Sequence, residues 1–167
     1  AMEERKGIHL LPNALKLIPI NYLQSMQLNL IGVGPLTDDI SNYLQKIGVS
    51  FHFFGQLNAS EVSFILRKSH GFCLPSLIDP NPLSVIEALA TGLPLLISER
   101  VGNVRECVPS INNGWIFDPI SPVSFSDAIL NWLKADMDKI DNMSINSINI
   151  YKDNFSLEKV SKDFAKK

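Results

Sequence analysis

The sequence predicts an α/β fold in which a parallel β-sheet is flanked by helices and followed by a terminal helical segment. Short apolar runs of strand length alternate with amphipathic stretches of helix length, which is the pattern of βα units wound into a parallel sheet. Several runs are nearly continuous in apolar residues, as expected of strands that helices cover on both faces. The 167 residues suffice for one domain and not two, so we assign residues 1–167 to a single domain.

The elements follow in order along the chain. The first stretch, from Gly7 to Leu23, is expected to be a helix with an irregular end, because Pro12 and Pro19 interrupt it. The predicted strands are Leu28–Ile31, Val49–Phe54, Gly71–Leu74, Pro94–Ser98 and Trp115–Phe117. The predicted helices between them are Leu36–Ile47, Ala59–Ser69, Pro82–Thr91 and Asn103–Val108. The terminal helical segment contains Phe125, Ile129 and Leu133 on one face, then Asn142–Tyr151 and Leu157–Lys166.

Composition excludes several classes of protein. Hydrophobic residues make up 46% and charged residues 19% of the chain, which is typical of a globular protein and not of a disordered one. The net charge of -2 gives no positive field, so we expect no nucleic-acid partner. Cys73 and Cys107 lack metal-ligand spacing, and we expect no metal and two buried free thiols. No apolar run reaches the roughly 20 residues that span a bilayer, so we expect a cytoplasmic protein.

The most informative loop follows the third predicted strand. In open parallel sheets, ligands bind beyond the carboxyl ends of the strands, where helix N-termini attract anions. Asn81 is expected to cap the next helix and Pro82 to take its first position. The backbone amides of Leu83 and Ser84 would then point outward and bind a phosphate without a cationic side chain. The sequence therefore predicts an anion site at this helix start.

Two acidic residues flank that helix start. Glu87 shares a helix face with Leu83 and Ser84, and a carboxylate there would accept hydrogen bonds from two sugar hydroxyls. Asp79 lies in the loop ahead of the helix, where it would meet further hydroxyls. The spacing fits equally well a turn residue at position 79 and a solvated helix residue at position 87.

Three more features lie where strands give way to helices. Gly32-Val33-Gly34-Pro35 lacks the third glycine of a dinucleotide fingerprint, and it fits a tight turn as well as a phosphate loop. Lys6 would reach an anionic ligand across the same sheet edge or be solvated. Gly102 to Glu106 repeats the loop-then-helix arrangement, so the amide of Gly102 would contribute to the same crevice.

Taken in order, these segments resemble the group 1 family of retaining GT-B glycosyltransferases, and they match its Rossmann-like C-terminal domain. The resemblance implies that Glu87 holds the ribose hydroxyls of a nucleoside diphosphate sugar and that Leu83 and Ser84 carry its diphosphate. It also implies that Asp79 contacts the transferred sugar and that Lys6 neutralises the leaving diphosphate. The segments that carry the resemblance are Lys6-Gly7, Gly32 to Pro35, Phe54-Gly55, Leu74 to Ser76, Asp79 to Ala88, Thr91 to Pro94, Gly102 to Glu106 and Asn113-Gly114.

The sequence departs from the family pattern in three places. Asp79 stands where the family usually has Glu, and Pro82-Leu83 stands where it has an aromatic-Gly pair. The Gly-Arg that ends the family's first strand would fall at or before Ala1. The resemblance thus implies that the first strand and an N-terminal acceptor domain lie outside residues 1–167.

The expected function is donor binding in a glycosyltransferase that transfers a sugar, with retention, in building a bacterial surface glycan. The donor is expected to be UDP- or GDP-linked, with no further cofactor, and the other partner is the missing N-terminal domain. Membrane contact, at the inner face, is expected only through that domain, and residues 1–167 alone are expected to be inactive. Two alternatives are a non-catalytic nucleotide-sugar-binding module and one half of a nucleotide-sugar epimerase.

Overall fold

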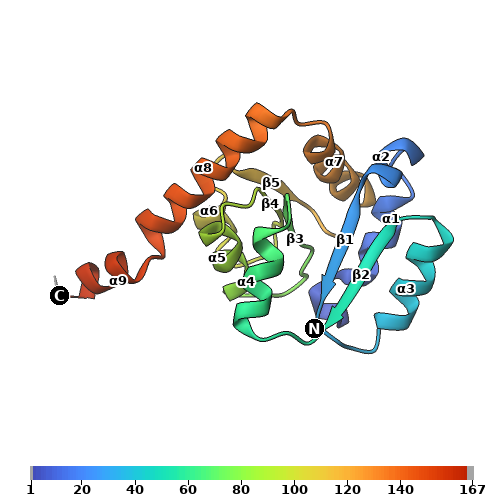
Figure 1. Cartoon of the computed structure of the whole chain (residues 1–167), viewed down its shortest axis with the longest axis horizontal. Helices are drawn as coiled ribbons and strands as arrows, with labels where there is room; N and C mark the ends of the chain where they lie inside the picture. Colours follow the sequence, from blue (N-terminus) through green and yellow to red (C-terminus); the bar gives the residue numbers. More distant parts are fainter. Residues whose placement is uncertain (1, 165–167) are drawn as a thin grey trace.

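A computed structural model describes residues 2–164 of the chain. Five parallel strands and their helices form the α/β arrangement that the sequence predicts (Figure 1). The strands are β1 (Gln27–Ile31), β2 (Ser50–Gly55), β3 (Phe72–Leu74), β4 (Leu95–Ser98) and β5 (Gly114–Phe117). The helices are α1 (Leu11–Leu15), α2 (Ile20–Ser25), α3 (Thr37–Lys46), α4 (Ala59–Arg67), α5 (Leu83–Ala90), α6 (Val104–Cys107), α7 (Pro122–Leu133), α8 (Met137–Asn154) and α9 (Leu157–Phe164).

The strands form two hydrogen-bonded sheets and not one. β1 pairs with β2, and β3, β4 and β5 pair in that order, all in parallel. Figure 1 shows these two groups side by side, and no strand of the described residues lies between β1 and β3. The parallel arrangement is as predicted, and within residues 2–164 it is divided into two sheets because β1 and β3 have no common hydrogen-bonded neighbour.

Strand β4 separates two hydrophobic cores. Its four residues are all buried, as expected of a central parallel strand. Leu96 faces a core built from α1, β1, α3 and α7, in which the rings of Phe117 and Phe125 stack with centroids 4.2 Å apart. Leu95 and Ile97 face the other core, which α5 and α6 cover. The alternation along one strand thus gives the fold its two helical layers.

The first stretch differs from the single helix that was predicted. Two short 3₁₀ turns, Glu4–Lys6 and Ile8–Leu10, precede α1, and a second helix, α2, follows it. Pro12 lies in the first turn of α1 and Pro19 is the N-cap of α2, so both prolines stand where a helix begins. They divide the stretch instead of bending one helix.

The terminal helical segment is confirmed and is longer than predicted. Asp136 caps α8 by accepting a hydrogen bond from the Lys139 amide at 2.8 Å, so the helix begins at Met137 and not at Asn142. Helix α8 packs on α5 and α6 and leads to α9, at the far end of the molecule from the N-terminus (Figure 1). The end of the last predicted helix, beyond position 164, lies outside the described residues. No described helix is long and apolar enough to cross a membrane.

Candidate functional site

Residues 2–5 join the two sheets at the carboxyl ends of their strands. The Met2 amide donates a hydrogen bond to the Val33 carbonyl, just past β1, at 3.1 Å. The Leu77 amide, just past β3, donates to the Arg5 carbonyl at 2.9 Å. Figure 1 shows the N-terminus beside the arrowheads of β1 and β2. The loops that follow β1 and β3 are thereby held at one edge, where ligands of parallel sheets bind.

Two predicted site residues that lie 73 positions apart meet at this edge. The Lys6 ammonium donates a hydrogen bond to the Asp79 carboxylate, and both side chains are largely covered, with exposed fractions of 23% and 11%. Gly7 makes the approach possible, because its φ is 68° and a Cβ there would lie 1.8 Å from the Pro75 carbonyl oxygen. The structure thus brings both predicted site residues together at one sheet edge, in a pair that the sequence did not predict.

The loop after β4 holds the other side of Asp79. The Gly102 amide donates to the Asp79 carbonyl at 3.0 Å, and a Cβ on Gly102 would lie 2.2 Å from the Pro80 carbonyl oxygen. The Asn103 side chain donates to Asn81 Oδ1 at 2.8 Å. The predicted capping role of Asn81 is therefore wrong, because its side-chain oxygen binds Asn103 and not the start of α5.

Helix α5 begins without a side-chain cap. Pro82 is its N-cap residue, with an extended backbone, and the first helical residue is Leu83. The prediction that Pro82 occupies the first helical position is thus wrong by one residue. Because the first amides of a helix have no acceptor within it, those of Leu83 and Ser84 remain available to a ligand at the positive end of the helix dipole. The missing cap strengthens the predicted anion site.

Glu87 lies one turn further along the solvent-facing side of α5. Its side chain is exposed, Leu83 is 70% exposed and Ser84 is half-buried. The buried face of the helix contains Val85, Ala88 and Leu89, so the sequence analysis placed Glu87 correctly away from the sheet. No hydrogen bond or ion pair between described residues joins Glu87 to the Lys6–Asp79 pair, which leaves its carboxylate open to a ligand.

The glycine loop after β1 completes the edge. The Gly32 amide donates to the Gly55 carbonyl of β2 at 2.7 Å, and the φ of Gly32 is 113°. Gly34 packs against the backbone of Met2, where a Cβ would lie 2.3 Å from the Met2 oxygen. Both glycines therefore have structural reasons to be glycine, and a tight turn accounts for them without a ligand.

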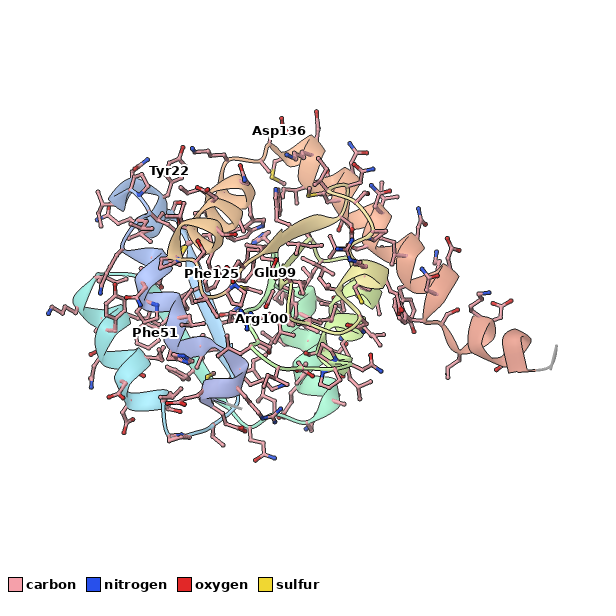
Figure 2. All side chains as sticks on the ribbon, turned by 180° about the vertical axis from the view of Figure 1, so that it is seen from behind. Tyr22, Phe51, Glu99, Arg100, Phe125 and Asp136 are labelled. Carbon is pink, nitrogen blue, oxygen red and sulfur yellow. The ribbon has the colours of Figure 1, made fainter. Side chains whose placement is uncertain are left out.

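Sequence reasoning gave no role to three polar groups near this edge. Ser76 is fully buried and Asn103 is 8% exposed, and neither Ser76 Oγ nor Asn103 Oδ1 has a hydrogen-bond partner among the described residues. Arg100 follows β4 and is exposed; Figure 2 places it near the middle of the molecule, next to Glu99. Nothing in the local sequence marks these groups, since only the packing of separate loops makes them neighbours of the site.

Neither the two surface hollows nor the possible metal ligands among the described residues indicate a different binding site. A shallow hollow of about 380 Å³ lies along α8, beside Met143, and one of about 320 Å³ lies between the end of β2 and α4, beside Phe64. Neither is lined by a predicted site residue, so we place the site at the sheet edge, where the predicted residues meet. Within residues 2–164, no group of three His, Cys, Asp or Glu side chains is placed to hold a metal ion.

Comparison with known proteins gives the family of this chain. Residues 1–149 match the model of the family described as glycosyl transferases group 1, and the chain belongs to this family. Sucrose-phosphate synthase 4 of Arabidopsis thaliana is 30% identical over 127 residues, which are 75% of this chain and 11% of that protein. An uncharacterised glycosyltransferase of Methanocaldococcus jannaschii is 26% identical over 89% of this chain and 42% of its own length.

Solved structures confirm the fold. The catalytic domain of cholesterol-α-glucosyltransferase from Helicobacter pylori superimposes with a TM-score of 0.77 at 21% identity, over 91% of this chain and 92% of that one. A single-residue mutant of S. aureus TarM, in complex with UDP and other ligands, gives a TM-score of 0.84 at 16% identity, over 99% of this chain and 33% of that one. This chain thus has the fold of a GT-B C-terminal domain, and it spans less than half the length of the curated relatives named above.

Proposed function

We propose that this chain is the donor-binding domain of a glycosyltransferase, and that a nucleoside diphosphate sugar binds at the edge formed by the loops after β1, β3 and β4. The observation that carries the proposal is the convergence of Lys6, Asp79 and the uncapped start of α5 on one loop, the loop after β3. A cation, a carboxylate and free amides in one place are the groups that a sugar diphosphate requires.

Each group has a separate role in this proposal. The diphosphate binds the amides of Leu83 and Ser84, and the Lys6 ammonium stabilises the negative charge that develops as the diphosphate leaves. The Glu87 carboxylate accepts hydrogen bonds from the ribose hydroxyls, and Asp79 accepts them from the transferred sugar. The loops that contain Gly32, Gly34 and Gly102 border the donor and shape the edge, since Gly34 packs on Met2 and Gly102 on Pro80. We propose that the sugar is transferred with retention, as the family resemblance implies.

Among nucleotides, we propose a uridine diphosphate donor ahead of a guanosine one. Two kinds of structural neighbour support it: TarM binds UDP, and HepE of Anabaena, with a TM-score of 0.81, binds UDP-glucose. A 28% identical Escherichia coli relative, over 60% of this chain, is a UDP-Gal-dependent galactosyltransferase that acts on a diphosphoundecaprenol-linked acceptor. That relative also supports the proposal of a bacterial glycan. We propose that the glycan is assembled in the cytoplasm at the membrane face. No cofactor beyond the donor is part of the proposal.

We also propose that the donor domain is completed by a strand outside residues 2–164. All four residues of β4 are buried, whereas none of β3 is, and β1 buries only Leu30. A central parallel strand is normally covered on both sides, so β1 and β3 behave as sheet edges. A strand running between them, parallel to both, would deliver the chain at Met2, which pairs with the end of β1. The acceptor site lies on a further domain, so this chain alone has no transferase activity.

Calorimetric titration with UDP, UDP-glucose and GDP tests the donor role. The chain should bind UDP, and Glu87→Gln should weaken that binding about tenfold, because two charge-assisted hydrogen bonds to the ribose are lost. Asp127→Asn is the matched control, since Asp127 is an exposed helix acid on α7, outside the site. Equal losses from Glu87→Gln and Asp127→Asn, or no binding of any nucleotide by the strand-completed protein, would contradict the proposal.

A further inference from the structure

We infer that Asp79 is a specificity-determining residue. It binds the Lys6 side chain while the site is empty, and the domain thereby binds the sugar-loaded donor in preference to the free nucleoside diphosphate. The inference rests on the proposed function, and it goes beyond it by giving the Lys6–Asp79 ion pair a role of its own. It starts from the hydrogen bond between the Lys6 ammonium and the Asp79 carboxylate.

The backbone builds this ion pair. The Arg5 carbonyl accepts hydrogen bonds from the amides of Leu77 and Ile78, at 2.9 and 3.3 Å. The next residue on each segment is a member of the pair, Lys6 on one side and Asp79 on the other. The Gly102 amide holds the Asp79 carbonyl from the opposite side at 3.0 Å. Because the backbone fixes both partners, no further backbone entropy is lost when the ions meet, and the cost is limited to the rotamer freedom of the two side chains.

A neighbouring ion pair shows what a pair without this support looks like. Arg5 Nε lies 2.9 Å from Glu3 Oε2, with side-chain exposed fractions of 54% and 41%. Exposed pairs of this kind contribute little, because water and salt screen them. The Lys6–Asp79 pair is covered, so each charge depends more strongly on its partner, and removal of one partner leaves the other poorly compensated.

A bound diphosphate must compete with Asp79 for the Lys6 ammonium. When Lys6 turns to the diphosphate, the Asp79 carboxylate loses its cation and faces a second anion, which disfavours binding. A sugar-loaded donor offsets this loss, because its hydroxyls donate hydrogen bonds to the freed carboxylate. The free nucleoside diphosphate has no such hydroxyls at this position. The Asp79 carboxylate therefore weakens binding of the free nucleoside diphosphate more than binding of the sugar-loaded donor. This difference assists release of the nucleoside diphosphate after sugar transfer.

The test compares UDP with UDP-glucose on the wild type and on Asp79→Asn, by calorimetry. Asparagine keeps the shape and removes the charge, so UDP should bind about fivefold more tightly, whereas UDP-glucose should gain less or lose affinity. Glu3→Gln is the matched control, since it removes the same charge from the exposed pair and should change neither affinity by more than about twofold. Unchanged or weaker UDP binding by Asp79→Asn would overturn the inference.

A second measurement tests the ion pair without any nucleotide. Acylation of lysines, followed by peptide mass spectrometry, should label Lys6 several-fold faster in Asp79→Asn than in the wild type, while the exposed Lys46 keeps its rate. Equal labelling of Lys6 in both proteins would show that the pair does not form and would overturn the inference. Faster labelling with no binding of any nucleotide would instead overturn the proposed function, and the donor selection with it, while the ion pair would stand.

Discussion

The two sheets differ in how completely their strands are covered. In the sheet of β3, β4 and β5, the central strand is buried at every position. In the sheet of β1 and β2, the residues of both strands are exposed or partly covered, except Leu30, which is buried. The core around β4 is thus finished, whereas β3 at the edge of its sheet and the β1–β2 pair are not. The functional groups gather where the finished and the unfinished region meet.

Cys73 of β3 lies at the same boundary between the two sheets. Its side chain is exposed to solvent. Its expected burial is therefore wrong for residues 2–164, because no described strand covers this edge of β3. The expected burial of the Cys107 thiol, in the finished core, is confirmed.

Gly7→Ala is the strongest way to break the joint between the two regions. Alanine there would adopt an unfavourable positive φ and press its Cβ against the Pro75 carbonyl, so we expect a loss of about 4 kcal/mol in unfolding free energy. Gly48→Ala is the control, because its φ is also positive, at 70°, and nothing lies within 4 Å of the added Cβ. It should cost only about 1 kcal/mol. Urea unfolding measures both, and equal losses would contradict the proposed role of Gly7.

Truncation of strand side chains compares the finished core with its edge. Ile97→Ala in β4 removes a fully buried side chain and should cost about 3 kcal/mol of unfolding free energy. Leu74→Ala in β3 removes a half-buried one and should cost about 1.5 kcal/mol. Thermal or urea unfolding gives the difference. If both substitutions lower the unfolding free energy equally, β3 is as well covered as β4. That result would contradict the proposal of a further strand beside β3.

The sequence predicted the elements well because their signals are local. All five strands begin and end within one residue of their predicted limits, since apolar runs and the glycines or prolines beside them are read directly from neighbouring residues. The break between β1 and β3 was not predicted, because strand pairing is not local. For the same reason, the sequence did not predict the Lys6–Asp79 pair or the hydrogen bond from the Asn103 side chain to Asn81. The cap of α8 at Asp136 was local and was missed.

Amide hydrogen exchange sharpens the contrast within a single strand. The Phe72 amide donates to the Pro94 carbonyl on the β4 side, so by alternation the Leu74 amide also faces β4 and the Cys73 amide faces away. We predict that the Cys73 amide exchanges about 30-fold faster than that of Leu74. In a protein that contains the proposed completing strand, the two amides should exchange at similar rates. Similar protection of both amides without that strand would contradict the open edge.

The buried thiol of Cys107 gives the smallest effect, a pH dependence. Burial, with a contribution from Glu106, raises its pKa from 9.0 to about 12, so the folded state disfavours the thiolate. This stabilisation is fully present below pH 9 and is lost as the pH rises from about 9 to 12. Between pH 9 and 10 the wild type should lose about 1 kcal/mol more unfolding free energy than Cys107→Ala. If the unfolding free energies of the wild type and of Cys107→Ala, measured in urea, change equally with pH, the folded protein does not raise this pKa.

The most direct test of the central claim is a UDP titration followed by ¹H–¹⁵N NMR, because the claim is that groups from both regions form one site. The account predicts that backbone amide signals shift together at Gly32 and Gly34, beside the unfinished sheet, and at Ser84 and Gly102, beside the finished one. The amide of Asn146, beside the hollow on α8, should not move. Shifts confined to one region, or centred on α8, would contradict the account.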